Sequence, residues 1–347
     1  MSLRIEVLSG LGGKAPAAIL VEAKGKRLLL DAGGALHPGQ SNEWAAGLDV
    51  DAVLITHDHI DHIGGVTALP GELPLYCTSP VAAALPPGRD WRLLPERGEC
   101  RIAGIPVTTG QAGHSLGGVW LHLGVAGGVF YSGDACLESL LLPFDEPPPA
   151  RVALLDASYG IYDVPQAQCR EAIARRLSEP RVLPVPASGR ALEMALWLDT
   201  LAPRLGITWD LDSVCRKGLE ALLELPRSLR RVGGDAAIRQ LLDAPRPTSP
   251  SLWLVADRDD DPHDWPAHRL LHTGYLTPRR QRQRVAGEVD WQRWNVHLRL
   301  SHLRALVRQL GARQVVPLFT TDVREVNELL MTPSGLMMAT EGSDAAG

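Results

Sequence analysis

The sequence predicts an α/β fold in which two packed sheets are joined to a smaller unit with a parallel sheet. Residues 1–135 contain short apolar runs separated by glycine-rich turns, which is typical of strands in packed sheets. From about residue 150, apolar runs alternate with stretches of helical spacing, which favours a parallel sheet covered by helices. A strand, a helix and a further strand follow near the C-terminus, so we expect the chain to return to the first unit.

The first unit is predicted to be made mostly of antiparallel strands, an arrangement that fits two sheets packed face to face. We expect its strands at Leu3–Leu8, Ala18–Glu22, Arg27–Asp31, Ala52–Thr56, Ile102–Thr108, Val119–Leu123 and Val129–Ser132. Helical spacing is sparse in this part of the chain. It is confined to His62–Leu69 and Ser79–Leu85.

The second unit shows the alternation expected of strands that are connected by helices. Helices are predicted at Gln166–Leu177, Arg190–Leu201, Ser213–Leu223 and Asp235–Leu242, with strands at Arg181–Val185 and Leu252–Val255. From Trp291 the pattern returns to a strand, and then predicts a helix at Ser301–Leu310 and a strand at Gln314–Phe319. A short C-terminal tail, 341–347, is expected to fray.

Composition excludes several classes of protein. No apolar run approaches the ~20 residues that span a bilayer, and Met1–Gly10 lacks the apolar stretch of a signal peptide, so we expect a cytoplasmic protein without membrane contact. The five cysteines are scattered and form no C-x-x-C pair, which argues against a disulfide framework or a cysteine zinc site. A net charge of −5 argues against a generic nucleic-acid coat protein.

The charge is unevenly distributed along the chain. Between Arg269 and Arg313 lie ten arginines and no lysine, against only Glu288 and Asp290, so this segment is +8 and the remainder −13. Two interpretations stay open: a local anion-binding face, or a solvated helix face with no ligand.

The chemistry is concentrated in Val53–Gly65, VLITHDHIDHIGG. His57 and His59 are two positions apart, so an extended chain directs both side chains to one side. Asp61 and His62 follow where the chain turns into a helix. Because three buried imidazoles and neighbouring carboxylates are hard to satisfy without a cation, we expect a metal site. One metal would take His57 and His59, and a second would take Asp61 and His62.

The motif THDHIDH resembles the H-x-H-x-D-H signature of the metallo-β-lactamase superfamily. The resemblance implies an αβ/βα sandwich with a two-metal site. It implies that Asp31, at the end of LLLDAGG, supports the metal loop, that His114 in AGHSLGG is a further ligand, and that Asp134 in YSGDA bridges both metals. Zn²⁺ suits imidazole and carboxylate ligands, although Mn²⁺ or Fe accepts the same set.

After Asp134 the chain resembles the β-CASP branch of that superfamily, which holds RNA and DNA nucleases. Asp156 in LLDASYG corresponds to its motif A, and Arg181–Leu192 to the strand, loop and helix that open its inserted domain, with an anion site at Gly189–Arg190. His272–Thr277 resembles the strand that returns to the core. These matches imply a core of residues 1–185 and 276–340 with a compact inserted β-CASP-like α/β domain at 186–275.

Two histidines compete for the branch's motif B, His297 and His302. The spacing to Phe319, where the branch has the motif C metal histidine, favours His297. The resemblance implies that Asp156 orients His297 as a general acid. A phenyl ring cannot ligate a metal, so the second metal is expected to be one ligand short and weakly bound. Arg299 is a further departure, because motif B has an acidic residue there.

We therefore expect a metal-dependent phosphodiesterase or nuclease that acts on RNA or single-stranded DNA through a metal-activated water. The expected catalytic residues are Asp61, Asp134, Asp156 and His297, and the expected metal ligands are His57, His59, Asp61, His62, His114 and Asp134. The alternatives are a small-molecule metallohydrolase, for a thioester, lactone or phosphodiester, and a binding protein with a degenerate site. The sequence leaves the oligomeric state open.

Overall fold

The computed structural model describes residues 3–227, 230–231, 233–257 and 265–331. The first of its three sheets has the strand order β1-β2-β3-β4-β5-β6. These strands are β1 (Leu3–Ser9), β2 (Ala18–Ala23), β3 (Lys26–Leu30), β4 (Ala52–Leu54), β5 (Leu75–Cys77) and β6 (Arg92–Leu93). The first three strands are antiparallel, and β3 to β6 run parallel.

The second sheet has the order β17-β11-β10-β9-β8-β7. Its strands are β7 (Gly98–Ile102), β8 (Ile105–Gln111), β9 (Val119–Leu123), β10 (Val129–Tyr131), β11 (Val152–Asp156) and β17 (Gln314–Leu318). From β7 to β10 the pairing is antiparallel, whereas β10, β11 and β17 are parallel. The C-terminal strand β17 therefore completes a sheet that the first half of the chain begins.

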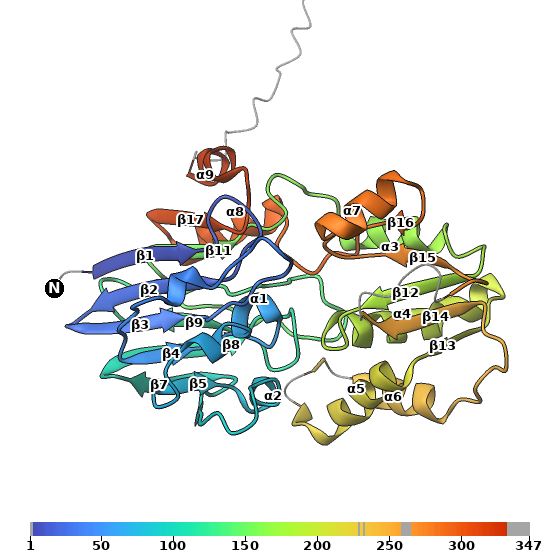
Figure 1. Ribbon diagram of the computed structural model, residues 1–347, viewed down its shortest axis with the longest axis horizontal. Coiled ribbons are helices and arrows are strands. Elements are labelled where there is room, and N and C mark those ends of the chain that lie inside the picture. The colour runs from blue at the N-terminus through green and yellow to red at the C-terminus, as the bar shows by residue number, and fades with distance from the viewer. Residues whose placement is uncertain (1–2, 228–229, 232, 258–264, 332–347) are drawn as a thin grey trace, which may run out of the picture.

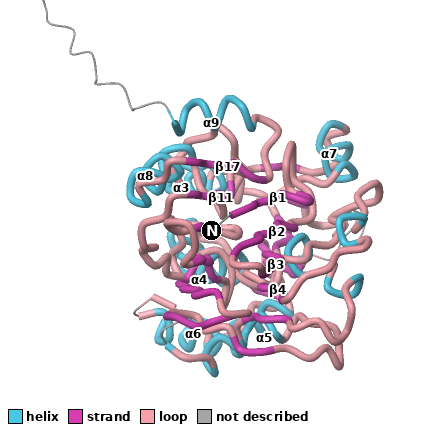
Figure 2. Tube along the Cα trace, turned by 90° about the vertical axis from the view of Figure 1, so that its left-hand side faces the viewer, coloured by secondary structure: helices cyan, strands magenta, loops and turns pink. Residues whose placement is uncertain are grey.

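The two sheets pack face to face, with helices on both outer faces (Figure 1). On β3, Leu28 and Leu30 point into the core between the sheets, while Leu29 packs on the outer side. That outer side is covered by the short helices α1 (Ile60–Ile63) and α2 (Ser79–Ala82). Helices α8 (Leu300–Leu310) and α9 (Val323–Met331) cover the other face, beside β11 and β17 (Figure 2). The predicted αβ/βα sandwich is confirmed.

A third sheet of five parallel strands, β13-β14-β12-β15-β16, has its own apolar core. Its strands are β12 (Arg181–Val185), β13 (Trp209–Leu211), β14 (Leu252–Ala256), β15 (Arg269–His272) and β16 (Asp290–Trp291). The helices of this region are α3 (Gln166–Ala174), α4 (Arg190–Leu205), α5 (Ser213–Glu224), α6 (Gly234–Asp243) and α7 (Pro278–Val285). This whole segment lies in the chain between β11 and β17, which are neighbours in the second sheet.

Most predicted elements are present, but several predictions were wrong in detail, and the predicted helix Ser79–Leu85 is only the single turn α2. The run Ile102–Thr108 is two strands, because Ala103 and Gly104 both adopt positive φ and turn the chain between β7 and β8. The predicted helix His62–Leu69 is one turn, α1, followed by the 3₁₀ turn Val66–Ala68. The run His272–Thr277 is not a strand returning to the core, because β15 ends at His272 within the third sheet.

Other expectations can be compared with the described residues. All five cysteines are free, and four of them are buried. None of the described helices is long and apolar enough to cross a membrane. The predicted tail 341–347 lies outside the described residues. The third sheet extends beyond the predicted limits 186 and 275 on both sides, from Arg181 to Trp291, so the inserted domain and its limits remain a prediction.

Candidate metal centre

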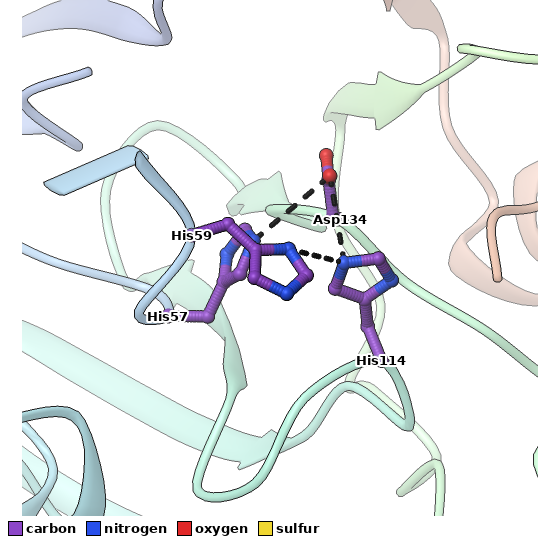
Figure 3. A group of neighbouring side chains, drawn as sticks. All are labelled: His57, His59, His114 and Asp134. Atoms are coloured by element: carbon purple, nitrogen blue, oxygen red, sulfur yellow. Dashed lines mark hydrogen bonds and ion pairs between the residues drawn. The ribbon is translucent and has the colours of Figure 1, made fainter. Parts of the chain in front are cut away.

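Three loops bring the ligand cluster together at one end of the sandwich. His57 and His59 follow β4, His114 lies between β8 and β9, and Asp134 follows β10 (Figure 3). All four come from turns that directly follow strands, so the sheets fix their positions. Gly113 shows how tightly the His114 turn is packed, because a Cβ there would lie 2.1 Å from the backbone oxygen of Cys136.

The donor atoms of these four residues converge on one point. Nε2 of His114 lies 2.9 Å from Nδ1 of His59 and 3.6 Å from Oδ2 of Asp134, and Nε2 of His57 lies 3.9 Å from the same oxygen. Ligand atoms of a tetrahedral zinc site, about 2.0–2.1 Å from the ion, are roughly 3.4 Å apart. The buried Nε2 of His57 has no hydrogen-bond partner among the described residues. Both observations fit a divalent metal ion.

Neighbouring groups set the protonation of these histidines. Nδ1 of His114 donates to the backbone oxygen of Val296 over 2.6 Å, which leaves the lone pair of Nε2 facing the centre. Thr56 Oγ1 donates to Asp31 and lies 3.1 Å from Nδ1 of His57, so it accepts from that nitrogen and frees Nε2 of His57. These assignments make both Nε2 atoms available as ligands.

Burial keeps the imidazoles neutral. It lowers the pKa of His59 to about 4, and together with neighbouring imidazoles it lowers the pKa of His57 and of His114 well below the usual histidine range. Neutral imidazole is the form that binds a metal, so little proton competition is expected near pH 7.

Asp31 supports the cluster from beneath, as the resemblance implies. Its buried carboxylate accepts from the backbone N–H of Thr56 (2.7 Å), from Nδ1 of His62 (2.7 Å) and from the hydroxyl of Tyr131 (2.6 Å). Sequence reasoning missed Thr56 and Tyr131, because neither is a metal ligand and Tyr131 lies 100 positions from Asp31. Asp31 therefore fixes His62 and the His57 loop through several charge-assisted bonds.

Asp61, His62 and Asp134 form a second group. His62 lies between two carboxylates, with Nδ1 2.7 Å from Asp31 and Nε2 3.2 Å from Asp134. Burial opposes the charged form of His62, but Asp134 and Asp31 outweigh burial and raise its pKa to about 10. Burial likewise opposes ionisation of Asp134, but Lys14 and His62 outweigh it and hold the pKa of Asp134 well below its usual range.

Lys14 is a further site residue that sequence reasoning did not identify. Its ammonium lies 2.7 Å from Oδ2 of Asp61 and 3.2 Å from Oδ2 of Asp134. Burial alone would lower the pKa of Lys14, but the carboxylates of Asp134 and Asp61 more than compensate and raise it above its ordinary value. The only signal in the sequence was a lysine in the glycine-rich run Ser9–Pro16, SGLGGKAP, directly after the first strand.

His297 and Asp156 meet at the edge of the cluster. Nδ1 of His297 lies 2.8 Å from Oδ2 of Asp156, and the other oxygen of Asp156 accepts from the backbone N–H and the hydroxyl of Ser158. His302, the competing histidine, lies instead in the first turn of α8 and contacts Arg299. The contact that the resemblance implies for His297 is therefore present, while its catalytic role remains to be tested.

Phe319 and Arg299, the two departures from the branch's motifs, have structural roles. Phe319 is 2% exposed, and its ring centroid lies 5.4 Å from that of His62. Its backbone N–H donates to Gly10, where a Cβ would lie 2.8 Å from the Phe319 ring. Arg299 forms ion pairs with Glu138 and Asp163.

A cavity of about 420 Å³ opens beside the cluster. Its walls include cationic, aromatic and catalytic candidates, namely Lys14, Tyr159, Tyr275, Arg284, Trp291, Arg293 and His297. The arginine-rich segment Arg269–Arg313 supplies Arg284 and Arg293. The segment is not one uniform surface, since Arg280 is 3% exposed and Arg269 pairs with Asp290.

Comparison with known proteins agrees with this geometry. Residues 26–183 match the family model of a beta-lactamase superfamily domain. The chain is 26% identical over 251 residues to transcription termination factor FttA of Cenarchaeum symbiosum, and 26% identical over 256 residues to FttA of Methanocaldococcus jannaschii. Residues 26–183 therefore form a domain of the beta-lactamase superfamily type. The similarity to the FttA proteins agrees with the resemblance to the β-CASP branch that motif A carries.

These relatives match the chain only in part. Each FttA alignment covers 57% of this chain and 39% of FttA, so the chain spans about two fifths of the length of these relatives. Ribonuclease Z of Methanopyrus kandleri is 38% identical over 66 residues, 17% of this chain and 24% of that protein.

A crystal structure of a protein of unknown function from Enterococcus faecalis V583 superposes with a TM-score of 0.65. Its sequence is 14% identical, and the match covers 96% of this chain and 97% of that one. This likeness shows the fold alone.

Proposed function

We propose that this protein is a metal-dependent phosphodiesterase that cleaves RNA or single-stranded DNA. One observation carries the proposal. The cavity beside the ligand cluster is lined by His297 and by two arginines, Arg284 and Arg293, that lie against aromatic rings. Phosphate needs cations, bases stack on aromatic rings, and the leaving oxygen needs a proton donor. All three kinds of group border one space.

The metal site we propose comprises His57, His59, His114 and Asp134, with zinc as the ion. Three neutral imidazoles and one carboxylate are a donor set that zinc prefers. When bound, the metal would supply a Lewis acid that lowers the pKa of a water molecule and polarises the phosphoryl group. Asp134 lies between the two ligand groups, so it is suited to orient that water.

His297 is proposed as the general acid. Because Nδ1 faces the Asp156 carboxylate, Nε2 is the nitrogen left to carry a proton toward the cavity. Attack of water on phosphorus forms one P–O bond and breaks another, and the departing oxygen takes the proton of Nε2. The proton donor is the imidazolium form of His297, in which both nitrogens carry a proton, and Asp156 stabilises this form because it accepts from Nδ1.

The substrate-binding groups come from the chain that follows β15. Arg293 lies over the rings of Tyr159 and Tyr162, at 4.3 Å from each centroid, and its buried Nη1 has no hydrogen-bond partner among the described residues. Arg284 lies 4.9 Å from the centroid of Trp291. An arginine stacked on rings keeps its charge available to a phosphate, so these two side chains are suited to hold the nucleic-acid backbone.

RNA is the better supported of the two nucleic acids. The printed names of the relatives connect one with transcription termination and another with RNA cleavage. A small-molecule metallohydrolase is the second candidate, because a cavity of about 420 Å³ falls within the range of small-ligand sites.

The deciding experiment compares end-labelled RNA, single-stranded DNA, a nitrophenyl phosphodiester, a thioester and a lactone as substrates of the metal-loaded protein. We expect the wild type to cleave the polynucleotides. His59→Ala should lose both this cleavage and the bound metal. The control variant His122→Gln should retain both, because His122 lies on β9 outside the cluster. Hydrolysis of only the thioester or lactone would support the second candidate. Full activity in the chelated protein would reject both.

A further inference from the structure

The loop between β1 and β2 fixes the position of Lys14. Phe319 donates its backbone N–H to the oxygen of Gly10 over 2.8 Å, and Ala17 donates to the oxygen of Asp61 over 2.7 Å. Between these anchors, Nε2 of Gln40 donates to the backbone oxygen of Lys14 over 2.8 Å. The loop is thus held on both sides of Lys14 and at Lys14 itself.

The side chain of Lys14 ends where a second metal would be bound. Its ammonium contacts Asp61 and Asp134, which are two of the three residues in the second ligand group. The lysine side chain is 14% exposed, and its nitrogen lies 5.3 Å from the centroid of Phe319. Two buried carboxylates need a neighbouring cation, and here that cation is the ammonium group of the Lys14 side chain.

The remaining groups fit a second metal poorly. Phe319 offers a ring face, which favours an ammonium but cannot ligate a metal. Both nitrogens of His62 already face carboxylates, Asp31 on one side and Asp134 on the other. A divalent ion placed here would contact the Lys14 ammonium and be repelled by it. The second site that the sequence predicts therefore disagrees with the residues that occupy it.

We propose that the protein binds one divalent metal ion, at His57, His59, His114 and Asp134, and that the Lys14 ammonium takes the place of a second. Lys14 lines the same cavity as His297. Its ammonium can therefore contact a non-bridging phosphoryl oxygen of the substrate and balance the charge that develops there. The catalytic role of Lys14 rests on the proposed function, whereas the number of bound metal ions does not depend on it.

The test is the metal stoichiometry of the intact protein, measured by native mass spectrometry during titration of the metal-free form with Zn²⁺ and with Co²⁺. We expect one tightly bound metal in the wild type and an electron paramagnetic resonance spectrum of isolated Co²⁺ at two equivalents. Lys14→Gln should keep the first metal, and the double variant Lys14→Gln with Phe319→His should gain a second. Lys217→Gln, an exposed lysine on α5, is the matched control.

The outcomes separate the possibilities. Two tight metals or magnetically coupled Co²⁺ in the wild type would overturn the inference, and would mean that Lys14 leaves the site when metal binds. If the double variant does not fold, the wild-type stoichiometry still decides the question. We also expect about a 100-fold loss of phosphodiesterase activity in Lys14→Gln, with partial rescue in Lys14→Arg. One metal without any phosphodiesterase activity would reject the proposed function and leave the site assignment intact.

Discussion

The hydroxyl of Tyr131, on β10 of the second sheet, donates to Oδ2 of Asp31 in the first sheet's loop over 2.6 Å. The bond crosses the interior of the sandwich, and both residues are fully buried. It joins the two sheets directly beneath the histidines. Asp31 is thereby satisfied before any metal is bound, so the loop is preorganised rather than shaped by the ion.

Tyr131→Phe should therefore lower the free energy of unfolding by roughly 1.5–3 kcal/mol, because it removes one charge-assisted hydrogen bond from a buried carboxylate. Chemical denaturation measures the change. Tyr76→Phe is the control, since the hydroxyl of Tyr76 bonds only the exposed Arg92 among the described residues, and we expect less than about 0.5 kcal/mol there. Equal stability of Tyr131→Phe and the wild type would contradict the supporting role of Asp31.

The buried Glu193 on α4 should make stability depend on pH. Burial raises its pKa to about 7, from an ordinary value of 4.5. The folded state then binds more protons than the unfolded state above about pH 4.5, so stability falls as the pH rises through 7, by on the order of 3 kcal/mol in total. Glu193→Gln should remove this decline and be more stable than the wild type at pH 8. Parallel pH profiles for the two proteins would contradict the prediction, and the exposed Glu220→Gln on α5 serves as control.

Variants of the two competing histidines separate catalysis from structure. We expect His297→Ala to lower kcat by roughly 10²- to 10⁴-fold, because the leaving oxygen loses its proton donor, and to keep the metal. Asp156→Asn should lower kcat by a smaller factor, because the imidazole ring of His297 would be less well oriented. His302→Ala should retain kcat, since His302 contacts Arg299 rather than the cavity. The measurements are kcat and metal content, and an equal loss of kcat in both histidine variants would refute the assignment.

The paired arginines of the cavity should control the affinity for single-stranded nucleic acid. Replacing Arg284 and Arg293 together by Ala should weaken binding and reduce the salt dependence, by about 0.7 in the logarithmic slope for each lost phosphate contact. Arg282→Ala is the control, because Arg282 is exposed on the same helix as Arg284 but does not line the cavity. Fluorescence anisotropy at several salt concentrations measures both quantities, and an unchanged slope would show that these arginines do not contact phosphate.

The sequence predicted the parts of the site that are encoded locally. His57, His59, Asp61 and His62 lie within six positions, so their spacing alone indicates a shared centre. Two strands were also predicted from local patterns alone, and Val119–Leu123 and Arg181–Val185 have the predicted bounds. His114 and Asp134 were found only through the resemblance, because a single histidine or aspartate in a turn carries little information.

The missed residues depend on contacts between distant parts of the chain. Lys14 reaches Asp134 across 120 positions, and neither residue type nor spacing reveals such a pair. The hairpin within 98–111 was missed for a different reason. Its turn, Ala103-Gly104, is too short to interrupt an apolar run, and alanine does not ordinarily adopt positive φ.

His114 is held between the turn that joins β12 to α4 and the chain that follows β16. Its ring donates to Val296, and its backbone oxygen lies so close to Gly189 that a Cβ there would approach within 2.5 Å. Without the segment between β11 and β17, the His114 ring would lose its hydrogen-bond acceptor and its turn would lose the backbone that packs against it. The turn that carries His114 and the segment between β11 and β17 therefore depend on each other structurally, so a change in one is expected to disturb the other.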